Sequence, residues 1–306
     1  MPMTERGDSS MLYLNGAFMA LDQGRVGVED RGFQLGDGVY EVVKVVDGRL
    51  LWMEDHLDRL AWSLGEIRLY GALEGHPLHQ ILPRLVEMSG VVSGTAYVQV
   101  TRGVAPREFA LPNDTPPTVL AYVRRDGFPG HREILDGIAL HAVEDIRWAR
   151  CDIKSTNLLA AVLAKHAARD AGAGEVLYVS PEGLVREGGS SNAFVFLDGV
   201  LRTHPANNRI LNGITRQHVL ELARGLDVRV DETAVSFDDL AHAEEIFIAS
   251  TTRDVMPVVK VSASGRDDLI VNGGRPGPVT LSLADAMRAG IPAAIGAPPP
   301  VTLSRN

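Results

Sequence analysis

A lysine in a polar turn, Lys154, is the residue of this chain whose type and setting best suit covalent chemistry. It lies in residues 151–157, between a predicted strand and a strongly apolar helical run. Most lysines in such junctions are solvated surface charges, because lysine is almost never fully buried without a partner. Three other polar groups favour a chemical role for it: the carboxylate of Glu187, the hydroxyl of Thr215 before a helix, and the hydroxyl cluster 250–252 after a strand.

These four groups match the needs of one cofactor. A lysine amine forms a Schiff base with an aldehyde, a carboxylate holds a protonated pyridine nitrogen, and hydroxyl-rich turns bind a phosphate. Pyridoxal 5′-phosphate requires all three functions. Residues 213–215 precede a predicted helix, so free backbone N–H groups and the positive end of the helix dipole add to a phosphate site. The same residues are also an ordinary helix cap, and by themselves they favour neither interpretation.

Other common sites are missing from the sequence. It has no Walker motif and no glycine pattern of a dinucleotide site. The turn 188–191 lacks the last glycine of a hydrolase nucleophile elbow, because Asn192 follows it. His56 lies in a predicted helix with no second histidine four residues later, so we expect no metal.

The composition is that of an ordinary globular protein. Hydrophobic residues make up 45% of the 306 residues and charged residues 23%, and the formal net charge of −9 disfavours nucleic acid as a partner. The single cysteine, Cys151, excludes an internal disulfide framework and fits a reducing cytoplasm. No apolar run reaches the roughly 18 residues of a membrane span, and the polar residues 1–10 are unlike a signal peptide. We therefore expect a cytoplasmic protein with a loose N-terminal tail and no membrane partner.

The first half of the chain alternates between strand and helix signals. The predicted elements are a hairpin at 12–20, a glycine-rich turn at 31–38, a strand at 39–45, helices at 54–67 and 78–88, and strands at 95–101 and 118–124. In the strand at 39–45, Tyr40, Val42 and Lys44 share one face, which is polar enough to line a site. Residues 102–117 contain several prolines and predict a long loop, and such loops are often functional.

The second half shows the same alternation. The predicted elements are a strand from 137 to 143 continuing toward 148, a helix at 158–171, strands at 174–179 and 193–197, a hairpin turn at 198–199, a helix at 216–225 with Thr215 as its N-cap, a short helix opened by Ser236 and Asp239, strands at 245–249 and 258–261, a helix at 280–289, and an irregular tail from Pro292. Length and composition predict two domains in a mixed α/β (α+β) fold. We expect a small N-terminal domain at 1–124, a linker at 125–133 and a larger cofactor-binding domain at 134–306.

Five motifs, in unbroken order between about Leu12 and about Val261, resemble those of the class IV (fold type IV) pyridoxal-phosphate aminotransferases. They are residues 151–157, 187–192, 203–208, 210–216 and 250–252. Within that class, residues 31–44 are most similar to the D-amino-acid aminotransferases. The resemblance implies two α/β domains with the cofactor between them. It also implies at least a homodimer, because sites of the family borrow a loop from the neighbouring subunit.

The resemblance further implies a role for each matched residue. Lys154 would carry the cofactor and, once freed by the incoming amine, move a proton between the substrate Cα and the cofactor C4′. Glu187 would keep the pyridine nitrogen protonated, and Arg59 would bind the phosphate with its planar fork. The implied cofactor-binding residues are Arg59, Lys154, Glu187, Ser190, Ser191, Asn192, Leu211, Gly213, Ile214, Thr215, Ser250 and Thr251. The implied substrate-binding residues are Tyr40, Val42, Lys44, Arg107, Phe109, Thr251 and Thr252.

The substrate loop departs from the family pattern. In D-amino-acid aminotransferases an arginine and, two residues later, a histidine act with the tyrosine on the substrate α-carboxylate. Here Arg107 is kept, but Phe109 stands at the histidine position, and Glu108 adds a negative charge. Loss of one hydrogen bond to a charged group costs about 1.5–3 kcal/mol. We therefore expect D-amino acids and a 2-keto acid such as pyruvate or 2-oxoglutarate as substrates, with (R)-primary amines accepted as well.

Three alternatives stay open at this point. A branched-chain L-amino-acid aminotransferase and an aminodeoxychorismate lyase are relatives in the same class. A non-catalytic binding protein on the same fold is the alternative from another class, because fold alone does not fix function.

Overall fold

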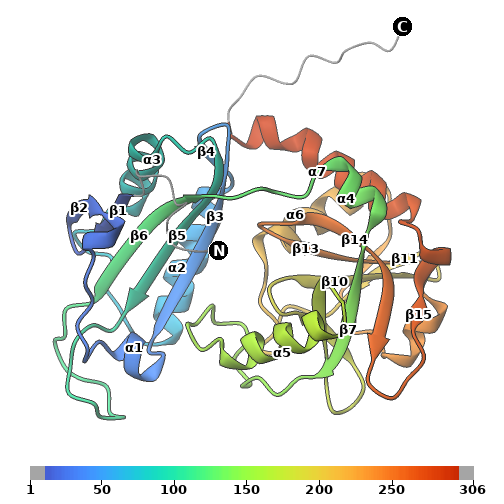
Figure 1. The fold of residues 1–306 in the computed structure, drawn as a ribbon, viewed down its shortest axis with the longest axis horizontal. Coiled ribbons are helices and arrows are strands. Elements are labelled where there is room, and N and C mark those ends of the chain that lie inside the picture. The colour runs from blue at the N-terminus through green and yellow to red at the C-terminus, as the bar shows by residue number, and fades with distance from the viewer. Residues whose placement is uncertain (1–10, 296–306) are drawn as a thin grey trace, which may run out of the picture. The chain divides into compact units, whose positions relative to one another are not determined.

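The computed structural model describes residues 11–295. Contacts between Cα atoms divide them into two compact units, 11–127 with 153–157, and 128–152 with 158–295. Each unit combines helices with a sheet (Figure 1), which confirms the expected two-domain α/β fold.

The segment around Lys154, residues 153–157, groups with the first unit, although the sequence analysis placed it inside the range of the second domain. The predicted domain boundaries at residues 124 and 134 stay a prediction. The expected N-terminal tail at 1–10 and most of the expected C-terminal tail lie outside the described residues.

The first unit contains a six-stranded antiparallel sheet in the order β2-β1-β6-β5-β3-β4. Its elements are β1 (Met11–Leu14), β2 (Ala17–Ala20), η2 (Leu21–Gln23), α1 (Arg31–Leu35), β3 (Gly38–Val46), β4 (Arg49–Leu50), α2 (Met53–Glu66), α3 (Leu78–Ser89), β5 (Ser93–Thr101) and β6 (Thr118–Arg125). The predicted hairpin is confirmed, because β1 and β2 turn at Asn15 and Gly16, whose φ values of 47° and 98° suit a type I′ turn.

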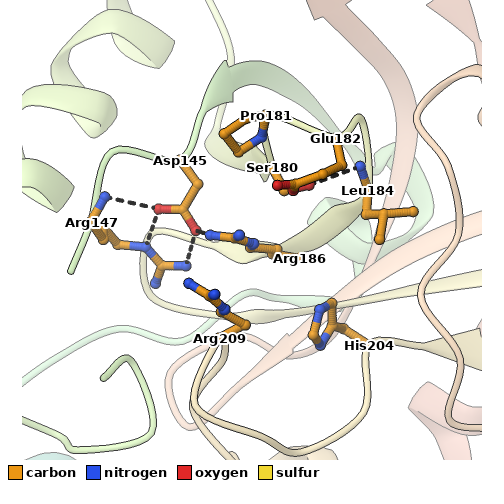
Figure 2. Close-up of a pocket in the computed structure, with 9 residues that line it drawn as sticks. All are labelled: Asp145, Arg147, Ser180, Pro181, Glu182, Leu184, Arg186, His204 and Arg209. Carbon is orange, nitrogen blue, oxygen red and sulfur yellow. Dashed lines mark hydrogen bonds and ion pairs between the residues drawn. The ribbon is translucent and has the colours of Figure 1, made fainter. Parts of the chain in front are cut away.

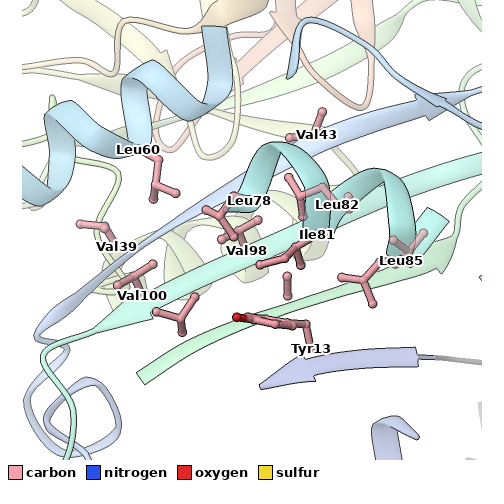
Figure 3. Packing of buried hydrophobic residues seen from close by; sticks show 14 of the residues in the cluster. Tyr13, Val39, Val43, Leu60, Leu78, Ile81, Leu82, Leu85, Val98 and Val100 are labelled. Atoms are coloured by element: carbon pink, nitrogen blue, oxygen red, sulfur yellow. The ribbon is translucent and has the colours of Figure 1, made fainter. Parts of the chain in front are cut away.

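Period-two alternation gives the sheet of the first unit one apolar face. On this face, β3 fully buries Val39, Val43 and Val45. The leucine-rich faces of α2 and α3 pack against the sheet and cover them. Figure 3 shows this packing, with Leu60 of α2 and Leu82 of α3 pointing into the same core. The core holds β3 in a fixed register, and this determines which side chains the opposite face presents.

The opposite face of this sheet carries a row of tyrosines. Tyr40 of β3 stacks on Tyr97 of β5 with 5.7 Å between ring centroids, and Tyr97 lies 5.2 Å from Tyr122 of β6. The register explains the row. Tyr97 pairs directly with Tyr122, and it lies two residues along β5 from the residue that pairs with Tyr40, on the same face. This is the polar face that the sequence predicted for Tyr40 and Val42.

The second unit is built around a nine-stranded sheet that closes on itself. Its elements are α4 (His131–Asp136), β7 (Ile138–Glu144), α5 (Leu159–Asp170), β8 (Glu175–Val179), β9 (Val185–Gly188), β10 (Asn192–Leu197), β11 (Val200–Thr203), α6 (Ile214–Gly225), β12 (Val230–Asp231), η3 (Asp238–His242), β13 (Glu245–Ser250), β14 (Asp254–Ala263), β15 (Leu269–Ile270), η4 (Val271–Gly274) and α7 (Pro278–Ala294). The order is β12-β11-β10-β13-β14-β7-β8-β9, the ninth strand β15 pairs with β14, and β9 pairs back onto β10. The six strands from β10 round to β9 therefore form a small closed barrel.

Barrel closure depends on one pair of residues, since Glu187 of β9 is the Cα partner of Asn192 of β10. The predicted cofactor acid is thus part of the closing contact. Gly188 follows at a place where a Cβ atom would lie 2.3 Å from the hydroxyl of Ser191, so the tight turn after Glu187 requires glycine.

Three expected element boundaries are wrong. Residues 31–35 form helix α1, because the Asp30 carboxylate caps the Gly32 N–H at 2.8 Å, a local bond that the glycines had obscured. The N-cap of α6 is Gly213 instead of Thr215, which lies inside the helix. Helix α7 continues through Pro292 to Ala294, so the first residues of the expected irregular tail are helical. Within residues 11–295, no helix is long and apolar enough to cross a bilayer.

Candidate active site

The backbone around Lys154 is hydrogen-bonded to the start of β3. The Tyr40 N–H donates to the Lys154 carbonyl at 2.9 Å, and the Thr156 N–H donates to the Gly38 carbonyl at 3.0 Å. Ser155 forms an isolated bridge with Val39. These bonds fix a segment without regular secondary structure, so the lysine side chain leaves from a rigid support.

The side chain of Lys154 reaches the tyrosine row. Its Nζ atom lies 4.5 Å from the centroid of the Tyr40 ring, within cation–π range. The side chain is half-buried, which suits an amine that must meet a substrate. Of the other predicted substrate residues on β3, Val42 is half-buried and Lys44 is 3% exposed. The structure therefore brings Lys154, Tyr40 and Val42 to one face of the first unit.

A buried ion cluster in the first unit orients Arg59. Its Nε and Nη2 atoms donate to the two oxygens of Glu41 at 2.7 and 2.9 Å, and Nδ1 of His56 lies 2.8 Å from Glu41 Oε2. Burial alone would raise the pKa of Glu41, but Arg59 and His56 outweigh it and hold that pKa well below its usual range. Burial lowers the pKa of His56. Arg59 is thus held by a fixed charged partner, which the sequence analysis did not find, and its contact with a phosphate stays a prediction.

The long loop is anchored at both ends by Asp30. The Asp30 carboxylate accepts from the hydroxyls of Thr101 and Thr118 at 3.0 and 2.6 Å, and these two residues flank the loop. Arg31 reaches further in, because its Nη1 atom donates to the Glu108 carbonyl at 2.6 Å. The loop stem is therefore rigid even though the loop lacks helices and strands beyond one isolated bridge.

The predicted carboxylate-binding residues lie at the tip of this loop. Arg107 is exposed, and its guanidinium makes no hydrogen bond or ion pair with any other residue in the described part of the chain. Phe109 is 87% exposed. The first unit by itself does not bring Arg107 and Tyr40 into hydrogen-bonding contact. The loop tip is thus available to another surface, as a loop shared between subunits would be.

In the second unit, Glu187 is held by three donors. Arg147 donates through Nη1 to Oε1 at 2.6 Å, while the Asn192 side-chain amide and the Leu211 N–H donate to Oε2, each at 3.1 Å. The carboxyl is 4% exposed, and burial raises its pKa to about 7 against the opposing effect of Arg147. A buried carboxyl with these donors can form an ion pair with one further cation, such as a pyridinium.

The partner of Glu187 is itself fixed by a second acid. Arg147 donates through Nε and Nη2 to both oxygens of Asp145 at 2.9 Å, and its guanidinium lies 4.0 Å from the centroid of the Tyr178 ring. The pKa of Asp145 is lowered, since hydrogen bonds from Arg147 and Arg186 outweigh burial. No local pattern singles out Arg147, because its contact with Glu187 joins residues that are 40 positions apart in the chain.

The two serines of the predicted motif behave differently. The Ser190 hydroxyl donates to Glu175 Oε2 at 3.0 Å, and Lys165 donates to the same oxygen at 2.9 Å. Ser190 is therefore engaged in holding the turn. The Ser191 hydroxyl oxygen is buried without a hydrogen-bond partner among the residues described.

The predicted phosphate-binding residues leave unsatisfied polar atoms. The hydroxyl oxygens of Thr215 in α6 and Ser250 at the end of β13 are both buried and lack a partner within residues 11–295, and α6 packs on β13. Gly213, the N-cap of α6, has no side chain to satisfy the first N–H groups, and its missing Cβ leaves room for Asn192. Buried hydroxyls are normally hydrogen-bonded, so the exceptions require an absent partner. Phosphate oxygens beside a helix N-terminus supply such a partner, and the residues therefore fit the cofactor phosphate.

The remaining predicted residues of the second unit have simpler settings. Ile214 is buried, Leu211 is half-buried next to Glu187, and Thr251 and Thr252 are half-buried after β13. Burial raises the pKa of the Cys151 thiol to about 11, so this thiol is no nucleophile. Among the described residues, no group of three His, Cys, Asp or Glu side chains is placed to hold a metal.

Comparison with known proteins identifies one matching family and a similar curated relative. The Amino-transferase class IV family matches residues 38–261. A D-alanine aminotransferase from Staphylococcus haemolyticus is 38% identical over 275 residues, which cover 90% of this chain and 95% of the relative. These matches run through the motifs at 151–157, 187–192 and 210–216.

Two solved structures share the fold. The branched-chain amino acid aminotransferase of Escherichia coli matches with a TM-score of 0.84 at 23% identity, covering 96% of this chain and 97% of that one. The 4-amino-4-deoxychorismate lyase of Pseudomonas aeruginosa matches with a TM-score of 0.78 at 27% identity, covering 90% and 98%. The fold is therefore shared by enzymes with different reactions.

Proposed function

This chain belongs to the class IV aminotransferases, and we propose that it moves an amino group from a D-amino acid to a 2-keto acid such as pyruvate or 2-oxoglutarate. The observation that carries the proposal is the 38% identity with a D-alanine aminotransferase over 90% of the chain. The chain is an enzyme of the class, and the cofactor of that class is pyridoxal 5′-phosphate. A ping-pong mechanism follows, because the amino group must rest on the cofactor between donor and acceptor.

When bound, pyridoxal 5′-phosphate supplies an aldehyde that bonds to amines and a ring that accepts electrons from the substrate Cα. Lys154 is our candidate for the group that holds the aldehyde carbon and then moves a proton at the substrate Cα. Hydrogen bonds to β3 hold the backbone at Lys154 rigid. This supports the role, because a proton is transferred efficiently only when its carrier is well positioned.

Glu187 is our candidate for the acid that holds a proton at the ring nitrogen. Its three donors orient both oxygens, so little reorganisation is needed when charge develops in the ring. Thr215, Ser250 and the N-terminus of α6 would orient the phosphate. Tyr40 lies beside the Lys154 amine and would exclude water from it on that side.

The substrate range follows from the loop tip. Arg107 would pair with the substrate α-carboxylate, while Phe109 supplies no hydrogen bond to it. We propose that this weaker carboxylate site also admits (R)-primary amines. The loop of one subunit would serve the site of its partner in a homodimer, and the lone buried Cys151 fits a cytoplasmic location.

The test is a substrate panel on the purified holoenzyme. We expect turnover of D-alanine with 2-oxoglutarate, slower turnover of (R)-1-phenylethylamine, and no comparable rate with L-leucine. Borohydride reduction should bleach the yellow protein and add the cofactor mass to the peptide containing Lys154, and Lys154→Ala should abolish both effects. Faster turnover of L-leucine would make this a branched-chain enzyme, and pyruvate release from 4-amino-4-deoxychorismate would make it a lyase. Either result refutes the proposal.

A further inference from the structure

A cavity of about 350 Å³ lies in the second unit beside the residues that hold Glu187. Three arginines line it, Arg147, Arg186 and Arg209, and Figure 2 shows Asp145 between the first two. The other lining residues are Asp145, Ser180, Pro181, Glu182, Leu184 and His204. The proposed transamination uses Arg147 through its bond to Glu187, but it leaves Arg186, Arg209 and His204 without a role.

Arg186 is a buried cation with most of its donors unused. Its side chain is 10% exposed, and Nη1 donates to Asp145 Oδ2 at 2.8 Å. Within residues 11–295, no other hydrogen bond of this guanidinium is found. A guanidinium carries five N–H donors, so four are left for whatever fills the cavity. Arg186 lines the cavity, so these donors can bond to an anion bound there.

Asp145 cannot supply the missing acceptors. Its Oδ1 atom accepts from the Arg147 N–H and Nε, and its Oδ2 atom accepts from Arg147 Nη2 and Arg186 Nη1. Both oxygens are therefore saturated, and the charge of Asp145 is shared by two cations. An added cation would find no open oxygen on Asp145.

Two more cavity groups define what would bind. The guanidinium of Arg209 is exposed and makes no hydrogen bond or ion pair within the part of the chain that the structure describes. Glu182 also lies on the cavity wall, and its pKa is lowered, chiefly by a hydrogen bond from Ser180 and further by Arg186 and Arg209. The open groups are therefore two cations, Arg186 and Arg209, against one anion, Glu182.

His204 adds an acceptor to this set. Its Nδ1 atom lies 2.9 Å from the Pro205 carbonyl oxygen, which can only accept, so Nδ1 carries the proton. Burial lowers the pKa of His204 and keeps the ring neutral, which leaves Nε2 as an acceptor. The cavity thus combines cationic donors with one neutral acceptor. Hydrogen phosphate has the complementary groups, namely negative oxygens and one O–H, whereas a plain carboxylate lacks the O–H.

We propose that this cavity binds a small oxyanion of the hydrogen phosphate class, with Arg186 and Arg209 on its negative oxygens and His204 on its O–H group. The bound species is inorganic phosphate, because its dianion keeps one O–H near neutral pH, whereas the dianion of a phosphate monoester has none. The site is separate from the predicted cofactor phosphate site at Thr215 and Ser250. Its existence does not depend on which amino acid the enzyme uses.

Calorimetric titration of the holoenzyme tests the proposal, because the cofactor then fills its own phosphate site. The probes are inorganic phosphate, methyl phosphate and malonate at constant ionic strength. We expect saturable phosphate binding, weakened about fivefold in Arg209→Ala and tightened in Glu182→Gln, since the first loses an attraction and the second a repulsion. Methyl phosphate, whose dianion lacks the O–H, should bind more weakly than inorganic phosphate, and equal or tighter binding would overturn the assignment of His204 to an O–H group.

Two controls separate this site from other sources of anion binding. Arg288→Ala removes one exposed cation from α7 and should leave phosphate affinity unchanged, which excludes an effect of net charge. Arg107→Ala should also leave it unchanged, which excludes binding at the proposed substrate carboxylate site. Equal phosphate affinity in wild type and Arg209→Ala, or no saturable binding by the wild type, overturns the proposal. Malonate binding as tight as phosphate binding would overturn the assignment to hydrogen phosphate.

Discussion

The guanidinium of Arg147 donates to Oε1 of Glu187 at 2.6 Å and to both oxygens of Asp145 at 2.9 Å. Glu187, the proposed cofactor acid, is therefore the end of a chain of alternating charges within the second unit. Burial raises the pKa of Glu187 to about 7, and Arg147 acts in the opposite direction. The ionised fraction of Glu187 near neutral pH depends on this one cation.

Replacing Arg147 by methionine should raise the pKa of Glu187 further. A higher pH is then needed to ionise the carboxyl, so kcat at pH 7 should fall about tenfold for each unit by which the pKa rises. Activity should recover as the pH increases toward 9. The measurement is the pH profile of kcat together with the visible absorption of the holoenzyme.

Arg147→Lys is the matched control, since it keeps the positive charge but loses the two-pronged contact with Asp145. Its pH profile should lie between those of the wild type and Arg147→Met. A profile for Arg147→Met that coincides with the wild type would show that Arg147 does not control the protonation of Glu187.

Glu41→Gln should destabilise the first unit. The carboxylate is fully buried and pairs with Arg59 and His56, so its loss leaves buried cationic donors poorly compensated, at a cost of about 3–5 kcal/mol at pH 7. The pKa of Glu41 is lowered in the folded state from its ordinary 4.5. Its stabilisation is therefore present above pH 4.5 and is lost as the pH falls below that value.

Urea unfolding of the cofactor-free protein measures this effect. The difference in free energy of unfolding between wild type and Glu41→Gln should narrow by about 1.4 kcal/mol for each pH unit below 4.5. Glu54→Gln, at an exposed position of α2, the helix that carries His56 and Arg59, should match the wild type throughout. A gap that stays constant down to pH 3 would rule out an ionised Glu41 as the stabilising group.

Thr215→Val should have opposite effects on the empty and the loaded protein. The Thr215 hydroxyl is buried without a partner, so replacing it with a methyl group should leave the free energy of unfolding without cofactor unchanged or raise it by about 1 kcal/mol. Affinity for pyridoxal 5′-phosphate should fall about tenfold, because one bond to a charged phosphate is lost.

Absorbance titration with the cofactor and urea unfolding without it give the two quantities for Thr215→Val. Thr280→Val is the control, since Thr280 in α7 also has a buried hydroxyl without a partner among the described residues. It should stabilise the protein equally and leave cofactor affinity unchanged. Normal cofactor affinity in Thr215→Val would remove Thr215 from the phosphate site.

Features that depend on neighbouring residues in the chain could be predicted from the sequence. The hairpin at 12–20, the helix at 158–171 and the loop at 102–117 follow from turn residues, apolar spacing and proline content, and the structure confirms them. The exposure of the apolar stripe on α5, including Leu159 at 72%, could not be read from spacing alone. Spacing gives the face of a helix but not what covers it.

Features that depend on distant partners were missed. Glu41 is 15 residues from His56 and 18 from Arg59 in the chain, and Arg147 is 40 residues from Glu187. The packing of α2 on β3 creates the first two contacts, and the fold of the segment after β7 creates the third, so no local pattern records them. The motif resemblance pointed to Glu187 but not to Arg147, since Arg147 lies outside the motifs.

Phe109→His tests the proposed carboxylate site at the loop tip. Phe109 is 87% exposed, so the change should not disturb the fold. The added ring nitrogen supplies a hydrogen-bond donor to a substrate carboxylate, which is worth about 1.5–3 kcal/mol, or at least about tenfold in kcat/KM for D-alanine. (R)-1-phenylethylamine has no carboxylate, and its kcat/KM should not increase.

Leu111→His is the control for Phe109→His, because Leu111 is also exposed and lies on the same loop but is two residues further on. It should change kcat/KM for neither substrate. Arg107→Ala should lower kcat/KM for D-alanine far more than for the amine, which ties both loop positions to the same carboxylate. A parallel gain for D-alanine and the amine in Phe109→His would mean that residue 109 alters loop closure, and the weakened carboxylate site would have to be abandoned.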